Sequence, residues 1–316
     1  MNAIRVALAV FGLIGTGLNT IVLYVLFKVR IGSRMTTVHM RCQCVLDGYT
    51  CFITFLYKVI GASIVTGLPG LDAFLCVVWF QDNLIWIGII MSLLNIACVS
   101  LDRFVAVFFP VQYRLQQNRL LYFTFTYIIL TGTVVFLPNF LYRQYRDGQC
   151  VHNSSHHGPA VETYLKYDAY SWLVLIYLIP ISFMTVSHAL IIYGITKRMK
   201  HTTGPNATMK RLTVTTLLMA SILILSHSYD LSTYTLASLK LTRYQYLSTS
   251  QQLGVLFIIW SSCLLPCVLA SMNRSIRGYL HTNLFLCLRF CKIRAGQPET
   301  KSDDVFVLSN SGHEGE

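Results

Sequence analysis

The sequence predicts an all-α membrane protein: a seven-transmembrane helix bundle with a short amphipathic helix after the seventh span. Three observations support this prediction. Hydrophobic residues make up 54% of the 316 residues and charged residues only 12%, about half the charge of an ordinary soluble domain. Seven apolar stretches are each long enough to cross a bilayer, which takes about 20 residues. The basic residues lie in short clusters between these stretches, as in the loops of membrane proteins.

The predicted spans follow one another in a single domain. The first span has no small-residue cleavage site at its end, so we expect a signal anchor rather than a cleaved signal peptide. The sixth is expected to be the least apolar, because Ser226, His227, Ser228 and Asp230 lie in its outer half. The spans are expected at 4–27, 37–60, 74–104, 120–141, 169–195, 212–239 and 246–272.

Lysine and arginine set the expected orientation. Of the 25 basic residues, 18 fall on the side of the C-terminus and 7 on the other side. Cytosolic loops carry the excess of basic residues, so we predict a multi-pass plasma-membrane protein with an extracellular N-terminus and a cytosolic C-terminus. Asn153 begins an Asn-Ser-Ser sequon in an outer loop and is expected to be glycosylated. The sequons at Asn206 and Asn273 would be cytosolic and unmodified.

The region after the seventh span differs from the bundle, which we assign to residues 1–272. Residues 273–291 alternate basic and apolar side chains near helical spacing, which predicts an amphipathic helix on the membrane surface. Cys287 and Cys291 are candidates for palmitoylation, with two reduced cytosolic thiols as the alternative. The last twenty residues are polar, acidic and rich in Ser and Thr, so we expect residues 292–316 to form a disordered cytosolic tail.

A charged pair ends the third span. Asp102-Arg103-Phe104 is followed by Pro110 and Tyr113, and charge at the edge of an apolar span is costly unless it is paired or functional. With seven spans in this orientation, the phrase resembles the Asp-Arg-Tyr motif and following Pro of rhodopsin-like G-protein-coupled receptors. The resemblance implies that Asp102, Arg103, Phe104 and Pro110 form the coupling region. Arg103 would contact a heterotrimeric G protein, and Asp102 would restrain Arg103 at rest. The alternative is a structural ion pair at the membrane edge.

Polar residues within the spans extend the resemblance. Asn19 and Asp47 match the family's polar residues in the first two helices, and Ser92 and Ser262 complete a set similar to its sodium pocket. An unpaired carboxylate at this depth costs at least ~2.5 kcal/mol, and oxygen ligands suit a hard cation. We therefore expect a sodium ion at Asp47 and no other cofactor. The alternative is a hydrogen-bonded structural cluster with a protonated Asp47.

The resemblance also implies a disulfide between Cys76 and Cys150 in an oxidising compartment. Cys76 stands two residues further from Arg103 than in the family pattern. Pro180 and Pro266 match the kink-forming prolines of the fifth and seventh helices.

Other family features are missing. The sixth span has no Pro, and the seventh reads Leu-Pro-Cys-Val-Leu over 265–269 where the family has Asn-Pro-x-x-Tyr. No acidic residue occurs from Lys197 to Arg211, so Arg103 has no carboxylate partner at the foot of the sixth helix. We therefore expect elevated ligand-independent signalling.

Ionisable and aromatic residues in the outer half of the spans predict the ligand cavity, because ionisable groups in a membrane mark functional sites. A cluster that only packs helices is the alternative. The wet, mixed-charge character favours a small peptide or polar small molecule. The candidate lining is Lys58, Asp82, Trp86, His227, Tyr229, Asp230 and Trp260.

We therefore predict a receptor that transmits an extracellular ligand signal to a heterotrimeric G protein, with arrestin as a further partner of the Ser/Thr-rich tail. The alternative function is a seven-helix transporter or ion-conducting protein that uses the intramembrane Asp and Lys residues. No nucleophile–base pattern or phosphate loop indicates an enzyme. The basic charge is explained by membrane topology, so nucleic acid is not an expected partner.

Overall fold

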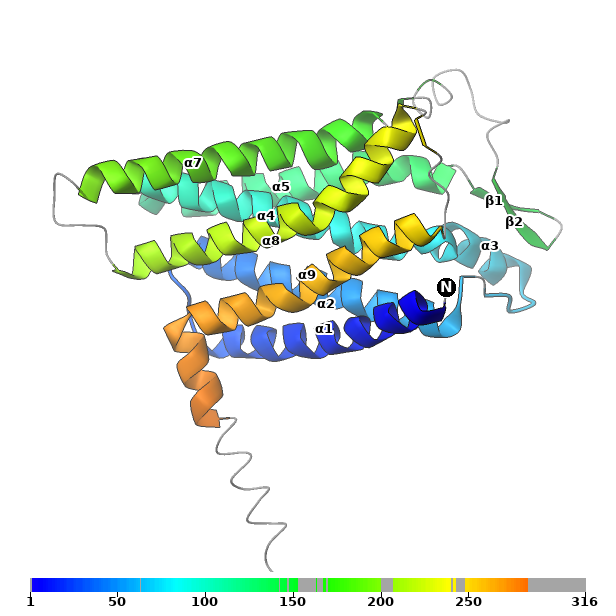
Figure 1. Cartoon of the computed structure of the whole chain (residues 1–316), viewed down its shortest axis with the longest axis horizontal. Coiled ribbons are helices and arrows are strands. Elements are labelled where there is room, and N and C mark those ends of the chain that lie inside the picture. The colour runs from blue at the N-terminus through cyan, green and yellow to red at the C-terminus, as the bar shows by residue number, and fades with distance from the viewer. Residues whose placement is uncertain are drawn as a thin grey trace, which may run out of the picture.

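The computed structural model describes residues 2–62, 64–141, 143–146, 148–152, 163, 167–168, 170–199, 207–239, 241–242 and 248–283. Long helices run side by side, and a small hairpin and the N-terminus lie at the same end of the bundle (Figure 1). The elements in chain order are α1 (Asn2–Lys28), α2 (Arg34–Ile60), α3 (Pro69–Val78), η1 (Phe80–Asp82), α4 (Asn83–Phe108), α5 (Pro110–Leu141), β1 (Arg143–Arg146), β2 (Gln149–His152), η2 (Leu173–Leu178), α7 (Ile179–Met199), α8 (Ala207–Ser238) and α9 (Thr249–Met272).

The helices confirm the predicted all-α class. In the described part of the chain, 6 helical segments are long and apolar enough to cross a membrane. The remaining long helix is α2, which carries Arg34, Arg41, Asp47 and Lys58. Our expectation that the sixth span is the least apolar was therefore wrong. The bundle tolerates this polar composition of α2 because several of its polar side chains, including Asp47, are buried inside the protein and do not contact lipid.

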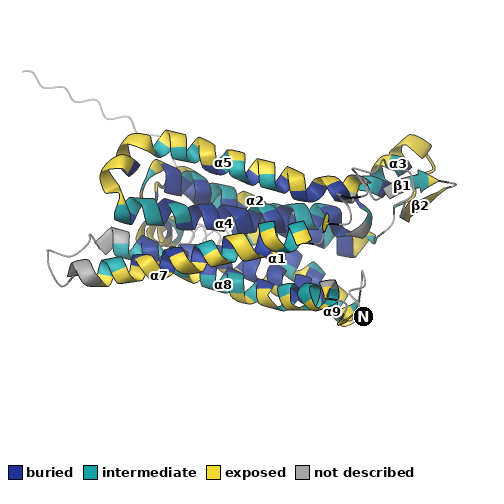
Figure 2. Cartoon of the chain, turned by 90° about the horizontal axis from the view of Figure 1, so that it is seen from above, coloured by how far each residue is buried: buried dark blue, intermediate teal, exposed yellow. Residues whose placement is uncertain are grey.

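α4 forms the centre of the bundle. It packs against α2, α5, α7 and α8, and Figure 2 shows it buried along much of its length while α1 and α5 carry many exposed residues. Leu93 and Leu94 of α4 are fully buried in the main core cluster together with Met184 of α7. Every shift of α4 would therefore disturb several neighbours at once, because protein interiors are close-packed.

The third span is not the continuous helix that we predicted. α3 ends at Val78, the 3-10 segment η1 follows, and α4 begins at Asn83. Between η1 and α4, Asp82 adopts the left-handed backbone conformation with φ 63°, which is uncommon outside glycine. This break accommodates the longer separation of Cys76 from Arg103. The predicted disulfide between Cys76 and Cys150 is present, with a Cα–Cα distance of 5.4 Å in the ordinary range.

The fifth span also contains an irregular segment. η2 is a π-helix, and α7 follows it directly with Pro180 in its first turn. Proline lacks the backbone N–H and clashes with the preceding turn, which explains the wider helix before it. The π-helix places Tyr177 inside the bundle, where its side chain is 1% exposed.

A short helix over 274–283 follows α9 and turns away from its axis (Figure 1). Asn273 caps this helix, because its Oδ1 accepts hydrogen bonds from the backbone N–H of Ser275 at 3.0 Å and of Ile276 at 3.4 Å. The helix begins where the amphipathic segment was predicted. Its place on the membrane surface stays a prediction, and Cys287, Cys291 and the tail 292–316 lie outside the described residues.

Close packing of α1 on α2 depends on small residues in α1. A Cβ atom built on Gly12 would lie 2.7 Å from the main-chain oxygen of Cys51 and 2.9 Å from the main-chain nitrogen of Phe55. Backbone atoms of a helix cannot move aside as a flexible side chain does. In contrast, a Cβ atom on Gly17, in the same helix, would have nothing within 4 Å.

This difference predicts opposite effects of two alanine substitutions in α1. Gly12→Ala should lower the stability by about 1–3 kcal/mol through overpacking against α2. Gly17→Ala should keep or raise the stability, since alanine favours a helix over glycine by about 1 kcal/mol. Thermal unfolding of the purified detergent-solubilised variants measures both. Equal melting temperatures of the two variants would contradict the close approach.

Candidate functional site

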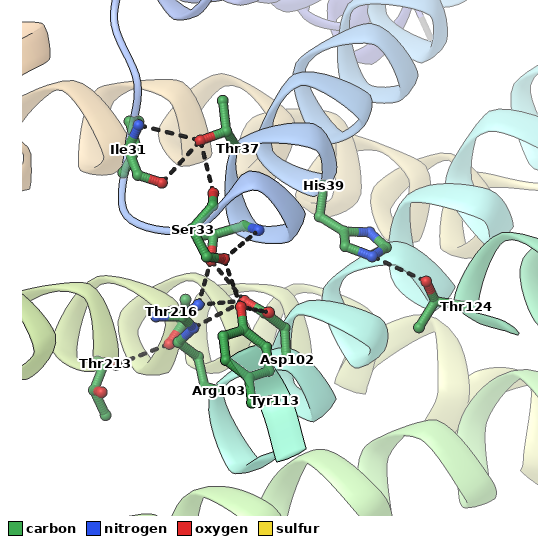
Figure 3. Close-up of polar contacts among 11 residues, drawn as sticks. Ile31, Ser33, Thr37, His39, Asp102, Arg103, Tyr113, Thr124, Thr213 and Thr216 are labelled. Atoms are coloured by element: carbon green, nitrogen blue, oxygen red, sulfur yellow. Dashed lines mark hydrogen bonds and ion pairs between the residues drawn. The ribbon is translucent and has the colours of Figure 1, made fainter. Parts of the chain in front are cut away.

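Asp102 and Arg103 lie near the end of α4 that is far from the hairpin, and both are buried, at 0% and 5% exposed. Their side chains form an ion pair. The Nε atom of Arg103 donates to Oδ2 of Asp102 at 3.0 Å, and a terminal guanidinium nitrogen of Arg103 contacts both this oxygen and Oγ1 of Thr36. The arginine is therefore held sideways against its own helix and α2 (Figure 3).

The second oxygen of Asp102 is also bound. Tyr113 of α5 donates its hydroxyl to Oδ1 of Asp102 at 2.5 Å, and Thr36 of α2 donates to Oδ2 at 2.8 Å. Ser33 caps α2 by accepting from the backbone N–H of Thr36, and its hydroxyl also contacts the hydroxyl of Tyr113. Three helices thus meet at one carboxylate. These residues are called the inner-mouth cluster below, after the orientation expected from the basic residues: Ser33, Thr36, Asp102, Arg103 and Tyr113.

Pro110 explains the spacing of the motif. It is the first residue of α5, where a proline is favourable because that position needs no N–H donor. Tyr113 follows within the first turn, and this turn directs its hydroxyl to Asp102. Phe104 packs differently: its ring lies 4.8 Å from the ring of Phe108. The predicted coupling residues are therefore close in the chain, but Phe104 contributes a ring contact and no hydrogen bond, since its side chain has no polar atom.

The foot of α8 approaches this cluster without an acidic residue. Thr213 and Thr216 are buried there, at 5% and 1% exposed, and Thr216 donates to the main-chain oxygen of Thr213 at 3.0 Å (Figure 3). His188 of α7 is buried, and its Nε2 lies 3.1 Å from the hydroxyl of Ser100. Among the described residues, Asp102 is thus the carboxylate that restrains Arg103.

The predicted polar core is assembled in the middle of the bundle. Asp47 of α2 is 1% exposed, and its Oδ1 accepts from Ser92 at 2.7 Å and from Ser262 at 3.5 Å. Asn19 is fully buried and donates to the main-chain oxygen of Ser262 at 2.9 Å. The four predicted residues therefore lie together, contributed by α1, α2, α4 and α9.

Sequence reasoning missed Gln43, which lies one turn before Asp47. Its Nε2 donates to Oδ2 of Asp47 at 2.9 Å and to Ser92 at 2.6 Å. The neighbours fix this orientation. Nδ2 of Asn95 lies 3.0 Å from the main-chain oxygen of His39, which only accepts, so this atom is the amide nitrogen of Asn95. The Gln43 atom 2.8 Å from it must then be the oxygen, which turns the Gln43 amide NH₂ toward Asp47.

This amide determines how well the site suits a cation. A sodium ion needs oxygen ligands with free lone pairs directed at it. The oxygens of Asp47, Ser92 and Ser262 have the right chemistry, but the NH₂ group of Gln43 points at the same carboxylate and carries partial positive charge. In this arrangement the residues do not fit a sodium ion. The geometry instead favours the alternative of a hydrogen-bonded structural cluster.

At the opposite end of the bundle, the hairpin of β1 and β2 lies over α3, with Tyr145 paired to Cys150 across the strands. Asp72 accepts from the backbone N–H of Thr66 at 2.7 Å and from the hydroxyl of Tyr145 at 3.3 Å. Burial and the neighbouring Asp72 carboxylate raise the pKa of the Tyr145 phenol. A cavity of about 290 Å³ opens here, lined by Ala62, Ile64, Val65, Asp72, Leu75, Cys76, Trp79, Phe80, Tyr145, Gly148, Gln149 and Cys150.

The residues predicted to line one ligand cavity make several different contacts. Lys58 and Asp82 are buried on α2 and η1, close enough for the charge of Asp82 to act on Lys58. Arg5 of α1 donates to the main-chain oxygen of Lys58 at 2.7 Å. Trp86 packs edge-to-face on Trp172, with ring centroids 5.8 Å apart.

The α8 candidates divide between two faces of the helix. Tyr177 of η2 donates to Asp230 at 2.8 Å, and the ring of His227 lies 6.1 Å from the ring of Tyr177. Tyr229 turns instead toward α9, where its hydroxyl lies 3.3 Å from that of Ser250.

Trp260 does not line this space. Its side chain is 49% exposed on the outer surface of α9 and stacks on Phe11 of α1 at 6.4 Å, so its inclusion was wrong. An aromatic residue in an apolar span faces lipid as readily as a cavity, and composition alone does not separate the two cases. Asn153 lies outside the described residues.

The Gln43 geometry predicts how the protein responds to sodium. The melting temperature of the purified protein should be the same in sodium chloride and in choline chloride, because the amide of Gln43 takes the place of the cation. Gln43→Leu should create a sodium-dependent rise of several degrees, since a bound ion stabilises the folded state. Adding Asp47→Asn to that variant should remove the rise. A sodium-dependent melting temperature in the parent protein would contradict this interpretation.

Among known families, the chain matches the one described as 7 transmembrane receptor (rhodopsin family), over residues 18–295. No curated protein matches it. The match includes the inner-mouth cluster, the polar core and the spans from α2 to α9. It does not favour the alternative of a transporter or ion-conducting protein, and members of this family are generally not enzymes. The chain is a multi-pass membrane protein, and it belongs to the rhodopsin family of seven-transmembrane receptors.

Proposed function

We propose that this receptor binds an extracellular ligand at the hairpin end and activates a heterotrimeric G protein at the inner-mouth cluster. The observation that carries the proposal is the buried ion pair of Arg103 and Asp102 at the far end of the bundle. A guanidinium buried at a helix end must be paired, and its partners here come from α2 and α4. An outward movement of α8 would uncover Arg103 for a partner protein.

The described contacts support a two-state mechanism. Arg103 is restrained by Asp102 and Thr36, and the carboxylate is in turn shared with Tyr113. A ligand that favours the open bundle shifts the population toward it by its difference in affinity for the two states. Since α8 offers Thr213 and Thr216 and no acid at this place, the closed state lacks one electrostatic restraint. We therefore propose measurable signalling without ligand.

For the ligand we propose a small peptide or polar molecule. The buried Lys58, Asp82 and Asp230 support this, because buried ionisable groups are retained at functional sites. The outer cavity beside the hairpin adds an apolar surface with Leu75 and Trp79, suited to a side chain of a peptide. Arrestin is a proposed second partner, through the Ser/Thr-rich segment 292–316.

Two substitutions in the inner-mouth cluster should change basal G-protein activation in opposite directions. Arg103→Ala should reduce nucleotide exchange to the level of membranes without receptor, because it removes the group that meets the G protein. Asp102→Asn should raise exchange severalfold, because neutralising the carboxylate weakens the restraint on Arg103 by about 1–3 kcal/mol. Guanine-nucleotide exchange on a promiscuous G protein, at equal surface expression, measures both.

The opposite signs are the control for folding, since damage to the fold lowers exchange in both variants. Basal exchange of the parent equal to that of empty membranes would contradict the proposed signalling without ligand. If the parent is active and Arg103→Ala has the same rate of nucleotide exchange, Arg103 does not take part in G-protein activation.

The proposed orientation, with the hairpin end outside the plasma membrane, is tested by glycosylation. Asn153 follows β2 directly, so it should carry a glycan in mammalian cells. Enzymatic deglycosylation should then increase the mobility of the protein on a gel, and Asn153→Gln should abolish this change. A glycan on Asn206 instead would show that the topology is the reverse of the proposed one.

A further inference from the structure

A basic cavity lies at the same end of the bundle as the inner-mouth cluster. Its volume is about 240 Å³, and three separate segments enclose it: the connection between α1 and α2, the first turns of α8, and the junction of α9 with the helix 274–283. It is a different place from the Asp102 carboxylate. The lining residues are Arg30, Ile31, Gly32, Arg211, Leu212, Thr215, Met272, Asn273, Arg274 and Ser275.

The charges in this cavity have one sign. Each of the three segments contributes an arginine, namely Arg30, Arg211 and Arg274. Arg211 is also close enough to Arg274 and Arg277 for their positive charges to act on it. No Asp or Glu is among the lining residues. Converging like charges repel each other, so an anion between them would relieve that repulsion.

The cavity wall is held in place by packing. Gly32 has φ +62°, and a Cβ atom on it would lie 2.7 Å from Cδ1 of Leu212, so the α1–α2 connection lies directly against the foot of α8. Ile31 and Ile276 are 2% and 0% exposed in the main core cluster. The backbone segments that carry the three arginines are therefore held in place by buried neighbours.

The start of the helix 274–283 adds to the positive potential. Asn273 and Arg274 lie in the cavity wall, so the cavity faces the N-terminal end of this helix. The backbone dipoles give that end a partial positive charge. This contribution has the same sign as the three arginines and comes from a separate structural feature.

We propose that this cavity binds the phosphate groups of an anionic headgroup. Guanidinium groups match phosphate oxygens with paired hydrogen bonds, which favours phosphate over a single carboxylate. The groups could come from an inositol phospholipid of the cytosolic leaflet or from a soluble inositol phosphate. Only the assignment to the cytosolic leaflet rests on the proposed function. A bound headgroup would connect α8 to the α1–α2 connection and to the helix after α9.

Binding is measured on the purified full-length receptor in phosphatidylcholine nanodiscs, without a G protein, so the result does not depend on signalling. The probe is a fluorescent phosphatidylinositol bisphosphate, and phosphatidylserine at equal total charge is the comparison. We expect saturable binding of the first lipid at least about tenfold tighter than of the second. Displacement by soluble inositol trisphosphate would show that the headgroup alone suffices, whereas lipid binding that resists it would assign the site to the membrane lipid.

The arginines are tested with a charge-matched control. Arg211→Gln combined with Arg274→Gln should weaken lipid binding about tenfold or more, because two phosphate partners are lost. Arg114→Gln combined with Arg119→Gln removes the same charge from exposed positions of α5 outside the cavity, and it should leave binding unchanged.

Arg30→Gln alone changes an exposed residue in the third wall and should weaken binding to a smaller extent. Equal melting temperatures of all variants show that the fold is kept. Equal binding of both lipids, equal losses in the two double variants, or full binding by Arg211→Gln with Arg274→Gln would each overturn the proposal.

Discussion

The Asp102 carboxylate is buried where neither water nor lipid can solvate it, so the surrounding chain has to supply its donors. Arg103, Thr36 and Tyr113 do so from α4, α2 and α5. Removing one donor from such a buried group costs far more than a surface hydrogen bond contributes. The ends of three helices are therefore fixed relative to one another by a single charge. The same charge holds Arg103 against α4.

α2 connects this cluster to the polar core. Thr36, His39, Gln43 and Asp47 follow one another at helical spacing, and all four are buried. His39 contacts Asn95 at 2.8 Å, Asn95 contacts Gln43 at 2.8 Å, and Gln43 contacts Asp47 at 2.9 Å. The polar side of α2 explains both its low hydropathy and its place against α4. A rotation of either helix would disturb the chain of hydrogen bonds along its length, because the amides of Gln43 and Asn95 each make three of these contacts.

The fold was predictable because a helix in lipid needs a long apolar stretch. The lengths of these stretches and the positions of the basic residues between them define the spans without any knowledge of packing. The inner-mouth pair and the disulfide also followed from the sequence. What failed depended on neighbours across the bundle. The sequence around Trp260 does not show whether its side chain faces α1 or a cavity. Gln43 appeared as one more polar residue until Asn95 and His39 fixed the direction of its amide. The break at Asp82 had a signal, the two extra residues after Cys76, but its form did not follow from sequence.

That break has a mechanical consequence for the hairpin end of the bundle. The disulfide attaches the hairpin to α3, while the left-handed residue Asp82 separates α3 from the rest of the third span. In an uninterrupted helix, a force on one end would be transmitted directly along the helix axis. Here the helix is interrupted, so a force on the hairpin reaches α4 through side-chain contacts across the break, such as that of Nδ2 of Asn83 with the main-chain oxygen of Val77 at 2.9 Å.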